Sequence, residues 1–251
     1  MEYQYHYTDQ PVAQEKLYDI AGRQNRADKI IAVLTDHFKE ISGLRLLDLS
    51  SSTGIMADLF ARHFKEVVGI DIDEKAVTFA KENFQKDNLT FQVMDGLKTE
   101  FPDGRFDVVV CNQMYEHVPD AWRLMDEIRR VLAPGGVCYF GATNRLNVIE
   151  SHYGRLPFLS WLPKPLAHLY LRILGRAKYY YETHYTYWTL RKLVRKFDWI
   201  DYTVRVVEDP VRFHAEDIVG NGSRQQRLAL AILKYTYWFF PGYIWLLKKT
   251  A

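Results

Sequence analysis

The segment Leu-Leu-Asp-Leu-Ser-Ser-Ser-Thr-Gly at residues 46–54 constrains the fold more than any other part of the chain. An apolar run ends there in very small residues, and a helical pattern follows at 54–64. This order predicts a strand, a tight loop and a helix whose N-terminus can approach a ligand. Seventeen residues after Gly54, a second apolar strand at 67–70 ends on Asp71, whose carboxylate could accept both hydroxyls of a ribose. We therefore expect a ligand that contains a nucleoside.

The glycine content of this loop bears on which ligand it can bind. A dinucleotide fingerprint has three glycines in the pattern G-x-G-x-x-G, so that the backbone can contact a pyrophosphate. Only Gly54 is present here. The loop argues against a nicotinamide oxidoreductase, which stays open as an alternative. A cofactor without phosphates needs only small side chains and a tight turn.

Strand and helix patterns alternate through the first 143 residues. Alternation of this kind predicts a parallel sheet with right-handed crossovers. Cys111 and Cys138 both fall in predicted core strands, where we expect buried free thiols. The expected strands are 46–49, 67–70, 89–94, 106–112 and 137–143, and the expected helices are 24–38, 54–64, 73–84 and 120–132.

The regular alternation ends after Thr143. Residues 145–187 are rich in aromatic residues and proline, and they are too many for a simple connection. We expect this insertion to form a cap before the penultimate strand. A helix is expected at 189–197 and a strand at 201–207. A second insertion at 209–240 should begin with a loop at 209–223.

The C-terminal tail, residues 228–247, allows two interpretations. Its length and apolarity approach those of a membrane span. Lys234 lies inside it, however, and Pro241 with Gly242 interrupts it. We predict a helix to about Phe239, a turn, and a final strand at 243–247, with a transmembrane helix as the alternative.

The order of these features resembles the class I S-adenosylmethionine-dependent methyltransferases, of the type 11 kind. Asp48 matches the acid that ends the first strand in this family, and Gly54 matches the last glycine of the loop. Ser50 and Ser52 stand where glycines are usual. The resemblance implies one domain over residues 1–251, with a Rossmann-like, doubly wound sheet of seven mostly parallel strands. The last strand should be antiparallel and lie beside the fifth.

The same resemblance implies S-adenosylmethionine as the cofactor and assigns residues to it. Asp71 would bind the ribose and Asp95 the adenine amino group, and the amide of Gly96 would meet the ring. The complete predicted cofactor site is Asp48, Ser50, Ser52, Gly54, Asp71, Asp95, Gly96, Asn112 and Gln113.

Glu116 and His117 follow the fourth strand and are the predicted catalytic pair. Methyl transfer to a hydroxyl requires alignment of the acceptor and removal of its proton. His117 could be the base, with Glu116 orienting it; alternatively, both residues only line the pocket. Gln113-x-x-Glu116-His117 is also similar to the Glu-x-x-Glu-His metal motif of some ubiquinone-biosynthesis and small-RNA methyltransferases.

We expect no metal ion in this chain. Gln113 replaces a carboxylate of that motif, and a neutral amide is a poorer ligand for a hard divalent ion. His152 or His184 would be needed to complete a site. In the insertion, we predict that His152, Tyr153, His184 and Tyr185 contact the methyl acceptor, the alternative being that they pack the cap or face water.

These expectations together predict methyl transfer to a small or lipid-like acceptor, first of all at oxygen. The alternatives are a cofactor-binding protein without catalysis and the nicotinamide oxidoreductase. The net charge of +2 provides no general field for nucleic acid. Residues 1–6 lack the pattern of a signal peptide, so we expect a cytoplasmic protein. Basic residues among the insertion's aromatics suggest peripheral contact with a membrane surface.

Overall fold

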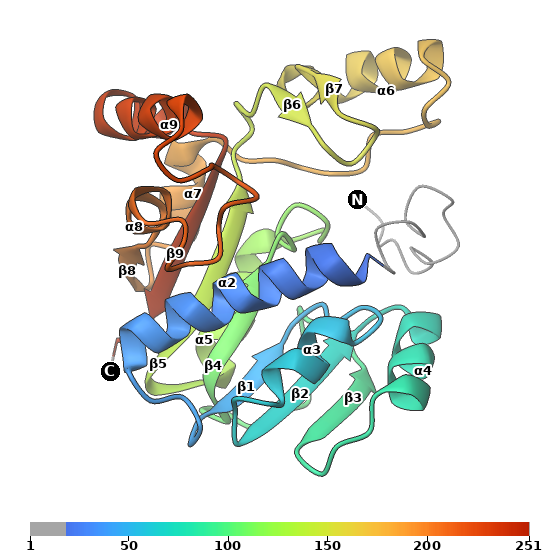
Figure 1. Ribbon diagram of the computed structural model, residues 1–251. Coiled ribbons are helices and arrows are strands. Elements are labelled where there is room, and N and C mark those ends of the chain that lie inside the picture. Colours follow the sequence, from blue (N-terminus) through green and yellow to red (C-terminus); the bar gives the residue numbers. More distant parts are fainter. Residues whose placement is uncertain (1–18, 251) are drawn as a thin grey trace.

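The computed structural model describes residues 19–250, so the prediction made from residues 1–6 lies outside the described part. A sheet of seven strands forms its centre, in the order β3-β2-β1-β4-β5-β9-β8 (Figure 1). Strand β9 is antiparallel to both of its neighbours, and the remaining neighbours are parallel. This confirms the predicted fold class. The strands are β1 (Arg45–Asp48), β2 (Glu66–Asp71), β3 (Leu89–Val93), β4 (Phe106–Asn112), β5 (Leu132–Thr143), β8 (Asp198–Asp201) and β9 (Gly242–Lys248).

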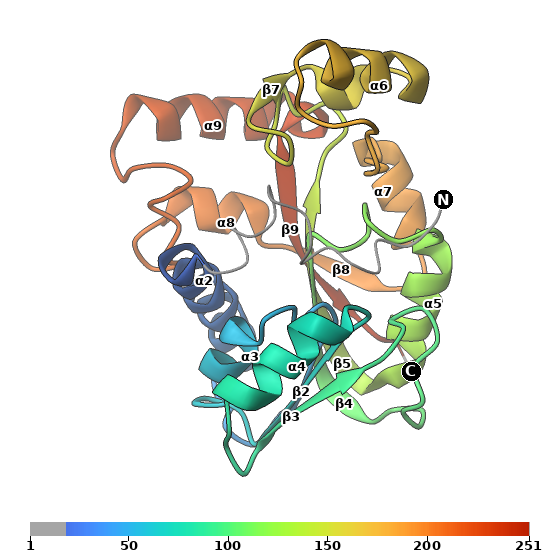
Figure 2. The ribbon, with the colours of Figure 1, turned by 90° about the vertical axis from the view of Figure 1, so that its right-hand side faces the viewer.

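Two apolar clusters cover the two faces of the sheet. Successive strand residues point to opposite faces, so Leu46 and Leu47 of β1 belong to different clusters. One cluster includes α2 (Ile20–Phe38), α3 (Ile55–Phe60) and α4 (Glu74–Asn83). The other includes α5 (Ala121–Val131), α7 (Tyr187–Leu193) and α9 (Arg224–Tyr235). The helices therefore form layers on both sides of the sheet (Figure 2).

Aspartates begin two of the predicted helices. The Asp73 carboxylate accepts hydrogen bonds from the backbone amides of Lys75 and Ala76 at the start of α4. Asp120 accepts from Trp122 and Arg123 at the start of α5 in the same way. These bonds satisfy amides that have no partner within the helix. The cap predicted at Asp73 is present.

The predicted strand at 201–207 is wrong. The strand in this region is β8, which ends at Asp201, and α8 (Thr203–Glu208) follows. The β-branched residues of this segment suggested a strand, but Thr203, Val206 and Val207 are buried at helical spacing. The Asp201 carboxylate also accepts from the amide of Thr203 and so helps the helix to begin.

The tail folds as a helix, a turn and a strand. Helix α9 ends at Tyr235, a 3₁₀ turn (η3, Tyr237–Phe239) follows, and β9 pairs with β5 over seven positions from Val137 to Thr143. Trp245 and Leu247 of β9 are fully buried. Within residues 19–250, no helix has the length and apolarity needed to cross a membrane. The strand interpretation of residues 243–247 holds in the structure.

The insertion after β5 has a small core of its own. It contains β6 (Ile149–Glu150), β7 (Leu156–Pro157), η2 (Leu159–Trp161) and α6 (Lys164–Ile173). In Figure 1 this unit lies beyond the ends of β4 and β5 that lead into the following loops. The residues of its core are Leu156, Leu159, Ala167, Leu171 and Tyr180.

Candidate active site

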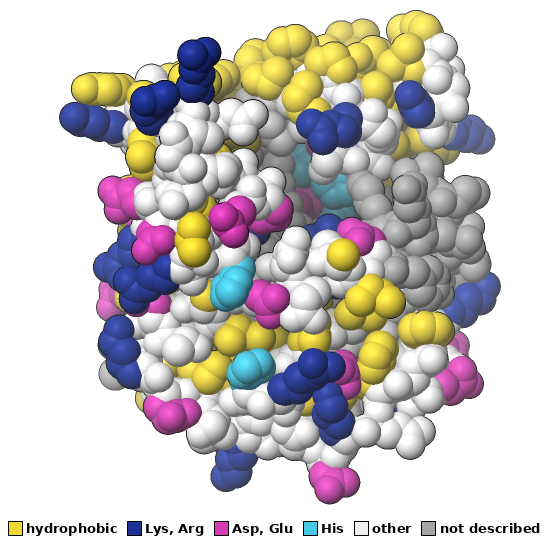
Figure 3. All heavy atoms as spheres, viewed as in Figure 1, with side chains coloured by type: hydrophobic (Ala, Val, Ile, Leu, Met, Phe, Trp, Pro, Cys, Tyr) yellow, Lys and Arg dark blue, Asp and Glu magenta, His cyan; other side chains and the backbone are white. Residues whose placement is uncertain are grey.

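A cleft lies at the carboxyl ends of the parallel strands, where ligands bind in sheets of this kind. Its volume of about 890 Å³ is within the range of small-molecule sites, roughly 300–1,000 Å³. The walls come from α2, the loops after β1, β2, β3 and β4, the insertion, and residues before and within β9. Figure 3 shows histidine side chains inside the hollow between the insertion and the sheet.

The small-residue loop after β1 forms one wall of this cleft. Gly54 has a φ of +80°, and a Cβ there would lie 2.7 Å from the Cβ of Ala80 and 2.8 Å from Cζ of Phe91. Only glycine combines this backbone with this close packing. Ser52 also has a positive φ, 50°, whereas Ser50 is not among the described residues with positive φ. One of the two glycine-replacing serines therefore has a glycine-like backbone. Ser50 and Ser52 line the cleft. Gly54 lets the loop pack closely against Ala80 and Phe91.

Asp71 connects this loop to the end of β2. Its Oδ2 accepts a hydrogen bond from the amide of Ser52 at 2.8 Å, and its Oδ1 accepts from the amide of Asp73 at 3.0 Å. Burial raises the pKa of the Asp71 carboxyl, and the two amide bonds oppose that shift. The carboxylate lines the cleft, and each oxygen has a second lone pair. Asp71 can thus order the loop and accept ligand hydroxyls at once.

Asp48 lies deeper, at the end of β1, with only 5% of its surface exposed. Burial raises the pKa of its carboxyl to about 7, and the charge of Arg23 opposes the shift. Arg23 is itself buried and lines the cleft from α2. Arg23 was not predicted as a site residue, although it lies four residues before the buried Ala27 on the same helix face. Lys29 and Asp217 were not predicted either; their ion pair, 2.9 Å long, joins α2 to the 209–223 segment at the cleft.

The other predicted cofactor residues line the cleft from β3 and β4. Oδ1 of Asp95 accepts from the amide of Leu97 at 2.8 Å. A Cβ on Gly96 would lie 2.8 Å from Cε of Met114, so glycine allows the close packing of Met114 here. Gln113 has a φ of 56° and accepts from Oγ1 of Thr143 at 2.5 Å. Asn112 completes this wall.

The residues present fit a nucleoside. Carboxylates of Asp71 and Asp95 face the cleft from adjacent strand ends, and the loop between β1 and α3 approaches without bulky side chains. The structure thus brings the cofactor residues predicted from sequence to one edge of the sheet.

Glu116 and His117 lie on the loop after β4, but they occupy different environments. His117 lines the cleft, and its Nδ1 lies 3.8 Å from Oε1 of Glu182, an acid that was not predicted as a site residue. Glu116 is fully buried and is not part of the cleft lining. Within residues 19–250, neither carboxylate oxygen of Glu116 has a hydrogen-bond partner. Burial accordingly raises the pKa of Glu116. No hydrogen bond links Glu116 to His117 in residues 19–250, and the orienting role of Glu116 stays a prediction.

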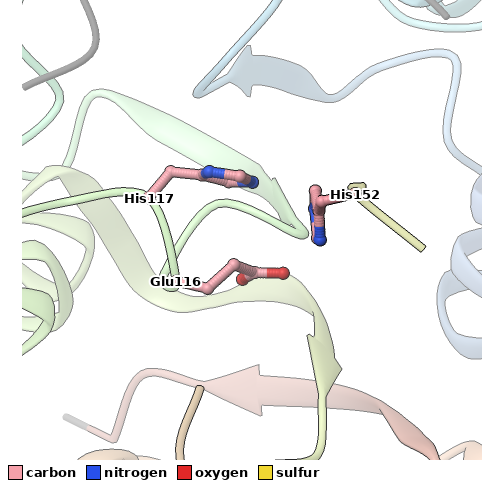
Figure 4. Close-up of side chains that lie close together, drawn as sticks. All are labelled: Glu116, His117 and His152. Atoms are coloured by element: carbon pink, nitrogen blue, oxygen red, sulfur yellow. The ribbon is translucent and has the colours of Figure 1, made fainter. Parts of the chain in front are cut away.

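His152 reaches the cleft from the insertion (Figure 4). Its Nδ1 lies 2.5 Å from Oε1 of Glu150. Nε2 of His184 lies 2.7 Å from Oε2 of the same acid, and the Tyr180 hydroxyl donates to that oxygen at 2.9 Å. Glu150 is 2% exposed. The insertion thus carries a buried carboxylate with three polar neighbours, only one of which lines the cleft.

The other residues predicted to contact the acceptor lie outside the cleft lining. The Tyr153 hydroxyl accepts from the amide of Tyr181. His184 is buried beside Glu150, and the ring of Tyr185 lies 5.5 Å from that of Tyr115. Tyr153 and His184 thus contact other residues of the insertion, Tyr185 joins the insertion to the loop after β4, and His152 is the predicted acceptor residue that reaches the cleft.

Two overlapping groups of side chains have the composition of metal ligands. Ligand-type atoms of Glu116, His117 and His152 lie within 4.8 Å of one another, as do those of Glu150, His152 and His184. His152 thus occupies the place that the sequence comparison required of an additional ligand, although one of its nitrogens already contacts Glu150. The absence of a metal stays a prediction.

A family model and the curated relatives that match this chain are both described as methyltransferases. Residues 47–140 match a family model described as a methyltransferase domain. A ubiquinone biosynthesis O-methyltransferase of Psychrobacter arcticus is 35% identical over 123 residues, which are 45% of this chain and 48% of the relative. The chain thus spans about half the length of the curated relatives that it matches.

Solved structures share the fold over most of the chain. An S-adenosylmethionine-dependent methyltransferase from Mesorhizobium loti has a TM-score of 0.56 at 17% identity, covering 84% of this chain and 93% of that one. The [4+2]-cyclase SpnF has a TM-score of 0.54 at 20% identity, covering 89% and 81%. Identities this low establish the fold alone. Residues 47–140 thus match a methyltransferase domain, and the chain as a whole shares the fold of these solved structures.

Proposed function

We propose that the protein transfers a methyl group from S-adenosylmethionine to an oxygen atom of a small or lipid-like acceptor. The observation that carries this proposal is the ordered edge of the sheet, where Asp71 holds Ser52 and presents its carboxylate to the cleft. The name of the Psychrobacter relative supports oxygen as the acceptor atom.

The residues of this edge would bind the cofactor. Asp71 would accept the ribose hydroxyls, and Asp95 with Gly96 would contact the adenine. Asn112 and Gln113 would border the reacting end of the cofactor. Bound S-adenosylmethionine would supply a methyl group already activated by a sulfonium. The chain then has to align the acceptor, exclude water and accept a proton.

The far side of the cleft favours an apolar acceptor. Val118, Val206, Ile218, Phe240 and Tyr243 line it, and they come from the loop after β4, α8, the 209–240 segment and β9. Burial of hydrocarbon against these side chains would stabilise binding by about 25 cal/mol for each Å² removed from water. The second insertion would thereby contribute to acceptor recognition.

The insertion also presents a surface that suits a membrane. Residues 151–181 contain no Asp or Glu, and neither do residues 218–251. In Figure 3 hydrophobic side chains gather over the upper edge, with basic ones beside them. The ring of Trp161 in the insertion lies 6.3 Å from that of Phe239 in η3, which joins the two acid-free segments. Exposed apolar residues of α6 and its surroundings are Phe158, Leu166, Leu169, Ile173 and Leu174, with exposed cations at Arg155, Arg172, Arg176 and Lys178.

Such a surface would bind anionic lipid through its cations and insert its apolar side chains shallowly. Flotation with phosphatidylglycerol vesicles tests this part of the proposal. Protein should float at low salt, and a Leu166→Asp/Ile173→Asp variant should float less. Protein that stays at the bottom of the gradient at low salt would contradict membrane contact.

Calorimetry with S-adenosylhomocysteine tests the cofactor, and NAD is the comparison ligand. We expect binding of S-adenosylhomocysteine, weakened by Asp71→Ala, and no comparable binding of NAD. Binding without methyl transfer to any acceptor in a broad screen of phenols and lipids would favour the non-catalytic alternative. Binding of NAD alone would favour an oxidoreductase.

A further inference from the structure

We propose that the insertion supplies the general base of the reaction, with His152 as the catalytic residue and Glu150 as the residue that positions it. This inference rests on the proposed methyl transfer to oxygen. It assigns removal of the acceptor's hydroxyl proton to a part of the chain outside the matched domain at residues 47–140.

The geometry of His152 fits this role. One ring nitrogen, Nδ1, lies 2.5 Å from Oε1 of Glu150, so a proton held there leaves Nε2 as the acceptor. The amide of His152 also donates to Oε1 of Glu150, at 3.1 Å. Two contacts to one carboxylate oxygen fix both the backbone and the ring. The side chain remains partly exposed and lines the cleft.

Glu150 is held in turn by residues that do not reach the cleft. Tyr180 donates its hydroxyl to Oε2, and His184 contacts the same oxygen. Its neighbours hold the pKa of Glu150 well below its usual range in spite of burial, so the acid stays ionised. A nucleophile or base within reach of an acid that is itself oriented by a third group is the arrangement that general base catalysis requires.

His117 is less suited to the same role. Among residues 19–250, its ion pair is with Glu182 at 3.8 Å, longer than the 2.5 Å between His152 and Glu150, and Glu116 next to it in sequence is buried outside the cleft lining. The His117 and His152 rings lie edge to face with centroids 5.0 Å apart. His117 thus borders the acceptor beside the base.

Several charged groups face His152 from the elements around it. Glu116 and His117 face it from the β4 loop, Glu150 from β6, and Glu182 and His184 from the segment before α7. The contact with Glu150 and the charges of the three acids raise the pKa of His152 against the effect of burial.

The transfer balances without an added co-reactant. The acceptor O–H bond breaks and its proton goes to Nε2 of His152. The oxygen uses a lone pair to form the new C–O bond. The S–CH₃ bond breaks at the same time, and its electron pair returns to sulfur. The imidazolium then loses its proton to water, which restores the base.

Two measurements test the assignment. The first follows the His152 imidazole by NMR against pH and needs no acceptor. Its pKa should lie above the ordinary range of a histidine and fall in Glu150→Gln. Glu150→Asp should restore part of the shift. A His152 pKa that is unaffected by Glu150→Gln would overturn the positioning role.

The second measurement is single-turnover methylation of 4-octylcatechol, an oxygen nucleophile with an apolar tail. His152→Gln should lower the rate by about 100-fold or more, as for loss of a general base. The pH at which the Glu150→Gln rate rises should move downward, together with the pKa of the base. The exposed His63 provides the matched control, and His63→Gln should leave the rate unchanged.

Three outcomes would contradict the base assignment. One is a wild-type rate in His152→Gln, and another is a larger loss in His117→Gln than in His152→Gln. The third is a rate that EDTA abolishes and a divalent ion restores, because the histidines would then be metal ligands. S-adenosylhomocysteine affinity, measured beside each rate, separates these outcomes from a failure of the proposed function. Thermal unfolding of each variant shows that it is folded.

Discussion

Two acids, one lining the cleft and one behind His152, are stabilised by different means. Asp71, at the end of β2, accepts hydrogen bonds from backbone amides that lie close to it in the strand–loop–helix unit. Glu150, in the insertion, is held by the side chains of His152, Tyr180 and His184. Backbone amides follow from the fold itself, whereas a set of imidazoles and a phenol requires particular residues in contact. The first arrangement suits a ligand common to the fold, and the second suits chemistry particular to this chain.

The largest effect is expected where the cofactor edge is most tightly packed. Gly54→Ala would place a methyl group 2.7 Å from Cβ of Ala80, at a φ of +80°. Left-handed backbone and overpacking should together lower the free energy of unfolding by about 2–4 kcal/mol. Urea unfolding measures this, and Gly43→Ala, where nothing lies within 4 Å of the new methyl group, is the control. Equal midpoints for the two variants would show that the loop is not closely packed.

Loss of the Asp71 carboxylate should mainly affect ligand binding. Asp71→Ala should weaken S-adenosylhomocysteine by about 1.5–3 kcal/mol, as for a hydrogen bond to a charged group. Asp73→Ala is a useful comparison, because Asp73 caps α4 and should affect stability more than affinity. If calorimetry shows unchanged affinity in Asp71→Ala, the carboxylate does not bind the ligand and only orders the loop.

The pair of Glu150 and His152 should give a stability that depends on pH. The folded pKa of Glu150 is lowered and that of His152 is raised. The acid's contribution is present above its unfolded pKa and is lost as the pH falls through the folded value. The histidine's contribution is present below its unfolded pKa and is lost as the pH rises through the folded value. Glu150→Gln should therefore cost about 1–3 kcal/mol near neutral pH and less at either extreme.

Urea midpoints measured across the pH range, for wild type and Glu150→Gln, give this difference directly. Asp48 must be considered in the same data. Its folded pKa is raised to about 7, so its contribution makes the protein more stable as the pH falls through 7. Because Asp48 is present in both proteins, its effect cancels in the difference. A difference that does not vary with pH would show that Glu150 and His152 are not coupled.

The smallest expected effect is at Ser52. Its φ of 50° places a serine in the left-handed region, which is less favourable for a serine than for a glycine. Ser52→Gly should raise the free energy of unfolding by up to about 1 kcal/mol, and S-adenosylhomocysteine affinity should stay the same or improve. Ser50→Gly should bring no such gain, since Ser50 is not among the described residues with positive φ. A large loss of affinity in Ser52→Gly would mean that its hydroxyl is a ligand.

Most of the sheet could be predicted because its signals are local. Each strand up to β5 is an apolar run that ends at a loop residue, and each following helix has its own apolar face. The position of Asp71 could be predicted on the same basis, since its place at the end of β2 brings it beside the loop of Ser52. The strand expected at 201–207 failed because β-branched residues also suit a short helix when the buried positions are three and four residues apart.

Contacts between distant residues could not be predicted in this way. Local patterns contain no information on the distance between Glu150 and His184, 34 positions apart in the chain, or on the approach of His152 to His117. Arg23 and Asp217 line the cleft, but they lie far in the sequence from the strands whose ends form it. The sequence by itself determined the alternation of strands and helices up to β5 and the edge of the sheet at which the small-residue loop meets Asp71, because apolar periodicity and small-residue loops act over a few residues. The tertiary structure alone decided which histidine meets an acid at the cleft, since that depends on how the insertion packs against the loop after β4.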